Sequence, residues 1–444
     1  MKMIEYIKEM IYKLFSDKSI KEALNIEVAI SDEMQSKIKQ WYDMYSGKAE
    51  WLSENIHSIR LEQSIVREFS NIVLNEMTVD ITNEKLNDIF NTALRDINMH
   101  FQEGLSSGAM VIKPLGEDKV QFLSQNSFIP LEYDSRGRLL KVIFPDFKTI
   151  GNDYYTRLEM HSIDKDKGLT IQNKAYHSKS KSYLGREIPL DIIDEWANLA
   201  AEVTYPDMNR PAFGYYRNPI NNTIDGSKVG VSIYDSATEL IRMTDIQFGR
   251  LDWEFESAER AIHVSEGAIK NNGTISKLNE RIYKSVDIEQ GVGEDLFKEF
   301  SPNLRQNDFI NGLDEYKREI EFIVGLSYGD ISNPQNVDKT ATEIKSAKAR
   351  KYNTVTAIQE NLKDCLEDLA YALAFFNTMA TVPYEFICNF KDSILTDEDA
   401  ERKSDLQDVS IGAMQLYEYR MKWYGESEEQ AKAVLSDNKV EVVE

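Results

Sequence analysis

The chain has 444 residues, of which 42% are hydrophobic and 29% are charged, a composition that excludes both a disordered chain and a membrane protein. The formal net charge of −23 argues against tight DNA binding through a basic surface. An acidic wall that surrounds DNA is still compatible with this charge, because it repels phosphates and lets a duplex slide. Two cysteines without a CxxC motif exclude a disulfide framework and fit a reducing compartment.

The first residues, 1–15, mix Lys and Glu with apolar residues and lack a small-residue cleavage site, so we expect a surface helix and no signal peptide. No apolar run approaches the roughly 20 residues that span a bilayer, and no membrane contact is expected. Helical spacing then predicts helices over 54–76 and 83–101. Short alternating runs predict strands, which we place at 109–114, 120–123, 139–144, 154–163 and 169–176. The last two form a hairpin around a turn at 164–168, so this third is α+β with antiparallel strands.

Residues 204–230 are rich in Pro, Gly and Asn and mark a boundary. A long amphipathic helix with one narrow apolar face is predicted next. It covers about 30 residues from Ser232, which is roughly 45 Å at 1.5 Å per residue. A short polar excursion separates it from a returning helix that begins near Phe309. After a loop, Thr340–Glu343 forms a capping box that opens a second very long helix, in which Cys365 fills the core. The remainder, 381–444, is acidic and mostly helical, so the whole chain is α+β and mainly helical.

Motifs for catalysis are absent from the sequence: there is no phosphate-binding GxxxxGK[ST], no HExxH and no GxSxG. Glu159 and His161 lie two apart on a predicted strand and can face one way, which fits a satisfied surface pair better than a metal site. We therefore expect no enzyme activity, no cofactor and no metal. A hydrolase with paired acids remains an alternative without a supporting motif.

A basic cluster follows the capping box and comprises Lys345, Lys348, Arg350 and Lys351, with Lys339 in the preceding loop. One interpretation is a solvated helix face. The other places these cations near DNA phosphates. The helix macrodipole mildly disfavours cations at a helix start, by a few tenths of a kcal/mol, which gives the second interpretation some weight.

Several strings, in this order of elements, resemble the portal proteins of long-tailed bacteriophages. They are Gly108–Pro114, Tyr154–His161, Gly230–Tyr234, Phe300–Arg305, Thr340–Glu343 and Phe390–Leu395. The likeness covers nearly the whole chain, and the order of the strings is a much stronger signal than any one of them. The resemblance implies a portal fold with these parts: an α/β wing at 1–231, stem helix 1 at 232–263, a clip at 264–307, stem helix 2 at 308–329, a tunnel loop at 330–341, a long helix at 342–380 and a helical crown at 381–444.

The family forms a twelve-fold ring at one capsid vertex, through which double-stranded DNA is packaged and ejected. The resemblance therefore implies a homo-oligomer in the virion, assembled in the host cytoplasm, with a terminase motor, a head–tail adaptor and the major capsid and scaffolding proteins as partners. The terminase, and not the portal, hydrolyses ATP. The tunnel loop would place Asn333, Gln335, Asn336 and Lys339 at the DNA channel.

The chain departs from longer relatives in two ways. Its C-terminal region is short, so the crown should be small, and its tunnel loop lacks a strongly basic character, which counts against direct gripping of phosphates. The main alternative is another helical virion protein, such as an adaptor or scaffold.

Overall fold

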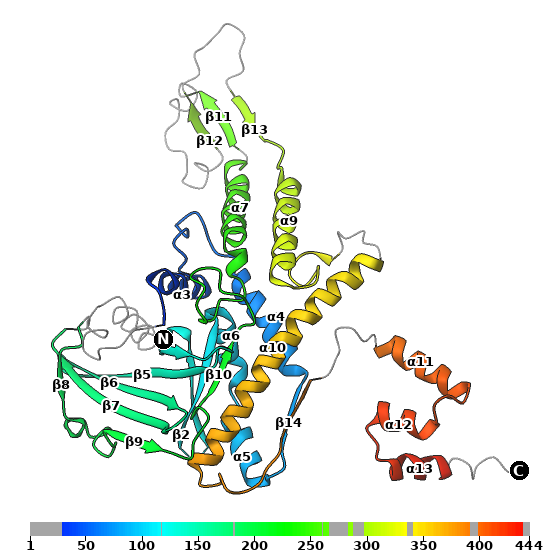
Figure 1. The fold of residues 1–444 in the computed structure, drawn as a ribbon. Helices are drawn as coiled ribbons and strands as arrows, with labels where there is room; N and C mark the ends of the chain where they lie inside the picture. Colours follow the sequence, from blue (N-terminus) through cyan, green and yellow to red (C-terminus); the bar gives the residue numbers. More distant parts are fainter. Residues whose placement is uncertain are drawn as a thin grey trace, which may run out of the picture.

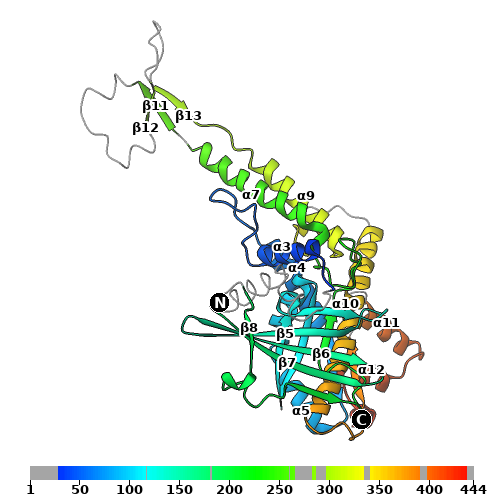
Figure 2. The same cartoon turned by 60° about the vertical axis from the view of Figure 1, so that its left-hand side comes forward.

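The computed structural model describes residues 29–116, 118–180, 183–259, 261–265, 283–286, 297–334, 341–390 and 398–437. The predicted helix at 1–15 lies outside these residues. The chain has an α+β fold, in which a body of helices and antiparallel sheets carries a pair of helices that projects away from it (Figures 1 and 2).

Four helices form one side of the body: α3 (Asp32–Tyr45), α4 (Leu61–Asn75), α5 (Glu84–Ala93) and α6 (Ile97–Ser107). The side chains of Ser31 and Asn83 cap α3 and α5 by accepting a hydrogen bond from a backbone N–H of the first turn. The helix predicted from residue 54 begins only at Leu61, because Arg60 takes a left-handed φ of 61° that no helix continues. The prediction of one helix over 83–101 is wrong, since the chain turns between α5 and α6.

The strands of the body are antiparallel, as predicted. One sheet has the order β10 (Gly214–Arg217), β2 (Ala109–Gly116), β3 (Lys119–Ser124). A six-stranded sheet has the order β4 (Ile129–Tyr133), β5 (Leu139–Ile150), β6 (Asp153–Asp164), β7 (Gly168–Ser178), β8 (Arg186–Ile188), and β9 (Glu202–Tyr205) also pairs with β7. The predicted hairpin is confirmed: β6 and β7 pair along their length, down to Asp164 opposite Gly168.

The projecting pair consists of α7 (Thr238–Ser257) and α9 (Gln306–Val324), which lie side by side in both views. A small sheet of β11 (Ala261–Ser265), β12 (Tyr283–Val286) and β13 (Phe297–Phe300) lies at their far end (Figure 1). The returning helix is confirmed. The first helix is shorter than predicted, at 20 residues, because 235–237 form a 3₁₀ turn and the chain becomes a strand at Ala261. We call α7 and α9 together the stem hairpin.

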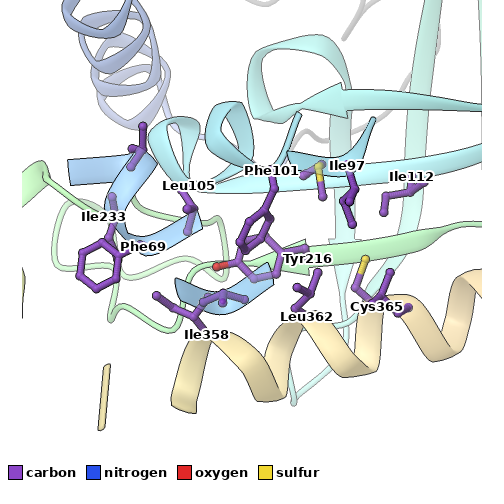
Figure 3. Close-up of a cluster of buried hydrophobic side chains, with 14 of the residues drawn as sticks. Phe69, Ile97, Phe101, Leu105, Ile112, Tyr216, Ile233, Ile358, Leu362 and Cys365 are labelled. Atoms are coloured by element: carbon purple, nitrogen blue, oxygen red, sulfur yellow. The ribbon is translucent and has the colours of Figure 1, made fainter. Parts of the chain in front are cut away.

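The longest helix, α10 (Ala341–Phe376), crosses the body diagonally (Figure 1) and confirms the second long helix of the sequence. Its apolar seam packs on α4, α5, β2 and β10, in the core that contains Phe101 and Tyr216 (Figure 3). Cys365 lies fully buried in this core, as predicted. The capping box of α10 includes Thr340, which lies outside the described residues.

The region predicted to be mostly helical contains a strand. β14 (Phe386–Phe390) pairs with β1 (Met77–Ile81), near the other end of the chain. Three short helices follow, α11 (Glu398–Ser410), α12 (Leu416–Tyr424) and α13 (Glu428–Asp437), and α12 packs on both of the others.

Candidate functional site at the base of the stem hairpin

The segment that follows α9 is tied to that helix by a buried carboxylate. Glu321 is fully buried and accepts hydrogen bonds from the backbone N–H groups of Gly329, Ile331 and Ser332, at 3.1, 2.6 and 2.8 Å to Oε1. The Ser332 hydroxyl also donates to its Oε2, at 2.8 Å. A carboxylate that accepts several N–H groups is a strong anchor, because each bond is charge-assisted. The segment 327–334, which we call the loop base, therefore leaves α9 in a fixed direction.

Two further contacts extend this anchoring. The backbone N–H of Asn333 donates to Asp314 Oδ1 at 2.7 Å, and Asp330 forms an ion pair with Lys351 at 2.9 Å. Lys351 also reaches Glu68 on α4, at 3.2 Å. These contacts join α9, α10 and α4 through the loop base.

The sequence-predicted channel residues are only partly described. Asn333 is exposed and lies at the end of the loop base. Gln335, Asn336 and Lys339 lie outside the described residues.

The basic cluster does not form a single cationic face. Lys348 is exposed, whereas Lys351 is half-buried between two carboxylates. The guanidinium of Arg350 stacks 4.5 Å from the ring centroid of Phe322 and 5.6 Å from that of Tyr328, so aromatic faces hold it. Lys345 lies in the first turns of α10, and its side chain is outside the described residues. Thus Arg350 and Lys351 already have partners within this chain.

An open groove of about 1040 Å³ lies beside the loop base. Its apolar lining comes from α7, α9, the start of α4 with the residues just before it, and the loop base, through Phe248, Ile310, Leu313, Ile59, Leu61 and Ile331. Charged side chains also line it, namely Arg67, Glu68, Asp314, Lys317 and Asp330. A mixed lining of this kind suits a protein side chain better than a small apolar molecule.

Residues 46–60 form a second connection between the stem hairpin and the body. The indole N–H of Trp51 donates to Asp245 Oδ2 at 2.9 Å, and the backbone N–H of Ile59 donates to Asp245 Oδ1 at 3.0 Å. Burial raises the pKa of Asp245, and these hydrogen bonds oppose the increase. Gly249 lets the segment approach α7, since a Cβ there would lie 2.6 Å from the carbonyl oxygen of Asn55. One side of α7 is therefore covered by 46–60.

Glu62, at the start of α4, is the neighbour of Asp245 in this region. Burial, with a smaller effect of the Asp245 charge, raises the pKa of Glu62 to about 7. Its Oε2 is buried and has no hydrogen-bond partner in the part of the chain that the structure describes, while the Ser58 hydroxyl lies 3.4 Å from Oε1. A buried carboxyl with so few donors favours the protonated form.

A separate charge cluster involves β2 and β6, which belong to two sheets of the body. Glu159 contacts Lys113 at 2.5 Å, the ring Nε2 of His161 at 2.7 Å and Arg157 at 2.8 Å. All but Arg157 are buried, so the prediction of a surface pair for Glu159 and His161 is wrong. Burial alone would raise the pKa of Glu159, but the His161 hydrogen bond and the charges of Lys113 and Arg157 hold it well below its usual range. The cluster joins β2 to β6, and within the described residues Nδ1 of His161 and Nε of Arg157 are buried without a hydrogen-bond partner.

Sequence reasoning missed Glu321, Asp314 and Glu68, since nothing in the local pattern distinguishes them from other acidic residues of a highly acidic chain. Within the described ranges, no group of three or more His, Cys, Asp or Glu is arranged to hold a metal ion. Among the same residues, no helix is long and apolar enough to cross a bilayer. No protein-family model matches the chain, and no curated protein matches it either.

Proposed function

We propose that this chain is the subunit of a bacteriophage portal, a ring at one capsid vertex through which double-stranded DNA is packaged and ejected. The observation that carries the proposal is the stem hairpin, which projects from the body and keeps large apolar side chains in solvent. Trp253 is 66% exposed and Phe255 is 45% exposed, and both lie near the far end of α7. Exposed apolar side chains gathered on one projecting element favour a protein partner, and identical copies supply one along the whole helix.

The charge of the chain supports the proposed passage of DNA through the ring. Twelve copies of a chain with a net charge of −23 would surround the channel with negative charge. Such a wall repels phosphates and lowers the friction on a moving duplex. The internal partners of Arg350 and Lys351 agree with this, because neither cation is left to grip DNA.

The stem hairpin also suggests where partners act. The small sheet β11–β13 at its far end would meet the terminase motor and the head–tail adaptor, and the body would face the capsid and scaffolding proteins. Hydrolysis of ATP would belong to the terminase.

The mass of the purified full-length protein in solution tests the proposal. A portal forms a stable large ring without other components, whereas an adaptor or scaffold protein stays a single subunit until it docks. A single subunit at every concentration would overturn the proposal. Metal-dependent nuclease or hydrolase activity in the pure protein would instead favour the enzyme alternative.

A further inference from the structure

The two free sides of α7 carry different residues. Successive residues of a helix are turned by about 100°, so positions three, four and seven apart share a side. Met243, Ile246, Arg250 and Trp253 follow this spacing, and we call them the outer stripe. Phe248, Asp252 and Phe255 follow it as well, and we call them the groove stripe, because Phe248 lines the groove at the base of the hairpin.

The two stripes lie on opposite sides of α7. Trp253 and Phe255 are two residues apart, which corresponds to a turn of about 200°. Residues 46–60 cover the helix between the stripes on one side, through Trp51 and Asn55. On the other side α9 covers α7, and the guanidinium of Arg305 forms an ion pair with Glu254 at 2.7 Å. Among the described residues both stripes therefore stay accessible, and neither packs against the other within one chain.

Each stripe combines apolar side chains with one charged residue, and the charges of the two stripes have opposite signs. Arg250 is exposed beside Trp253, and it has no carboxylate partner among the residues that the structure describes; its guanidinium only reaches Gln247 Oε1, at 3.4 Å. Asp252 is exposed between Phe248 and Phe255, and likewise has no cationic partner within the described part of the chain. Two surfaces that are both apolar and carry opposite charges are complementary.

We propose that the outer stripe of one copy docks on the groove stripe of the next copy, with Trp253 against Phe248 and Phe255, and Arg250 beside Asp252. This interface joins two different surfaces of the same chain, so it is head-to-tail and closes into a ring when the rotation per copy allows it. The large exposed Trp253 ring is the expected energetic centre, because tryptophan and arginine dominate such interfaces. This contact rests on the proposed function, because it would hold neighbouring copies of the portal ring together.

Single substitutions test each surface. Trp253→Glu blocks the outer stripe and Phe255→Glu blocks the groove stripe, so each purified variant should lose the ring and have the mass of one chain. Ile150→Glu is the matched control, since Ile150 is exposed to a similar degree but lies at the end of β5 in the wing. This control should assemble as the unmodified chain does.

Mixing the two variants gives the sharper result. Each retains the surface that the other lacks, so an equal mixture should form a dimer of one Trp253→Glu chain and one Phe255→Glu chain, and nothing larger. The dimer also proves that both variants fold. In the same way, Arg250→Glu and Asp252→Lys should each raise the protein concentration needed for ring formation at least tenfold. The double variant, which restores a pair of opposite charges, should form the ring at the original concentration.

The outcomes separate the two proposals. If the unmodified chain forms a ring and Trp253→Glu forms it equally well, the contact is wrong and the portal proposal stands. A mixture that stays monomeric although the unmodified chain forms a ring also overturns the contact. If the unmodified chain never assembles, both proposals are overturned.

Discussion

The carboxylate of Glu321, in the last turn of α9, accepts hydrogen bonds from both the backbone N–H and the hydroxyl of Ser332, each at 2.8 Å. Together with the bonds from Gly329 and Ile331, this places four donors on one buried side chain. This part of the loop base is therefore held to α9 by a single buried carboxylate.

Replacing Glu321 with Gln should loosen the loop base. The amide offers one acceptor oxygen in place of two and has no charge, so we expect a local loss of about 2 kcal/mol. The amide hydrogens of Gly329, Ile331 and Ser332 should then exchange with solvent roughly thirtyfold faster. Glu319→Gln is the control, because Glu319 is exposed on the same helix. Unchanged exchange in Glu321→Gln would show that the carboxylate does not hold this segment.

Glu62 should make stability fall as pH rises. Its pKa of about 7 in the folded chain is above the ordinary value of 4.5, so the folded chain binds this proton more tightly than the unfolded chain does between these pH values. Glu62→Gln cannot ionise and should be more stable than the unmodified chain above pH 7, by on the order of 2 kcal/mol. Denaturant unfolding at pH 5 and pH 8 measures this. The exposed Glu50→Gln serves as the control, and an advantage at pH 5 instead would contradict the assignment.

Breaking the buried charge cluster between β2 and β6 should be costly. Lys113→Met leaves the Glu159 carboxylate buried without its closest cation, and loss of one partner of a buried pair costs about 3 kcal/mol. The double variant with Glu159→Leu should recover much of this free energy of unfolding, because the buried carboxylate is removed together with its closest cation and Arg157 keeps Asp146 as a partner at 3.4 Å. Lys119→Met, on the exposed end of β3, should change little. A double variant no better than Lys113→Met would argue against the pairing.

Two helical glycines should respond in opposite ways to alanine. No atom of the described residues lies within 4 Å of a Cβ built at Gly312 in α9, so Gly312→Ala should gain the helix propensity, about 1 kcal/mol. At Gly249 in α7 the same methyl would meet the Asn55 carbonyl oxygen at 2.6 Å, so Gly249→Ala should lower the melting temperature and loosen 46–60. If both variants gained stability equally, residues 46–60 would not lie against α7.

Local patterns predicted much of the fold. The seams of α9 and α10 and the β6–β7 hairpin depend on neighbours close in sequence, and the structure has them. The pairing of β1 with β14 joins segments some three hundred residues apart, and no local signal reveals such a partner. At the end of α7 a local pattern was misleading. Helical spacing of apolar residues continues to Ile262, although the chain is already a strand there.

The candidate site was less predictable for the same reason. The run of cations from Lys345 to Lys351 reads as one basic face, but Lys351 meets Glu68 and Asp330 only because α4 and the loop base pack against α10. Arg350 stacks on Phe322 and Tyr328 from α9 and the segment after it. Tertiary packing, which the sequence does not display, decides which charges face solvent.

An end-on electron micrograph of the purified full-length protein tests the central claim most directly. The account predicts closed rings of identical subunits around an open centre, with the stem hairpins side by side. Particles without a central hole, or lone compact subunits at every concentration, would contradict it.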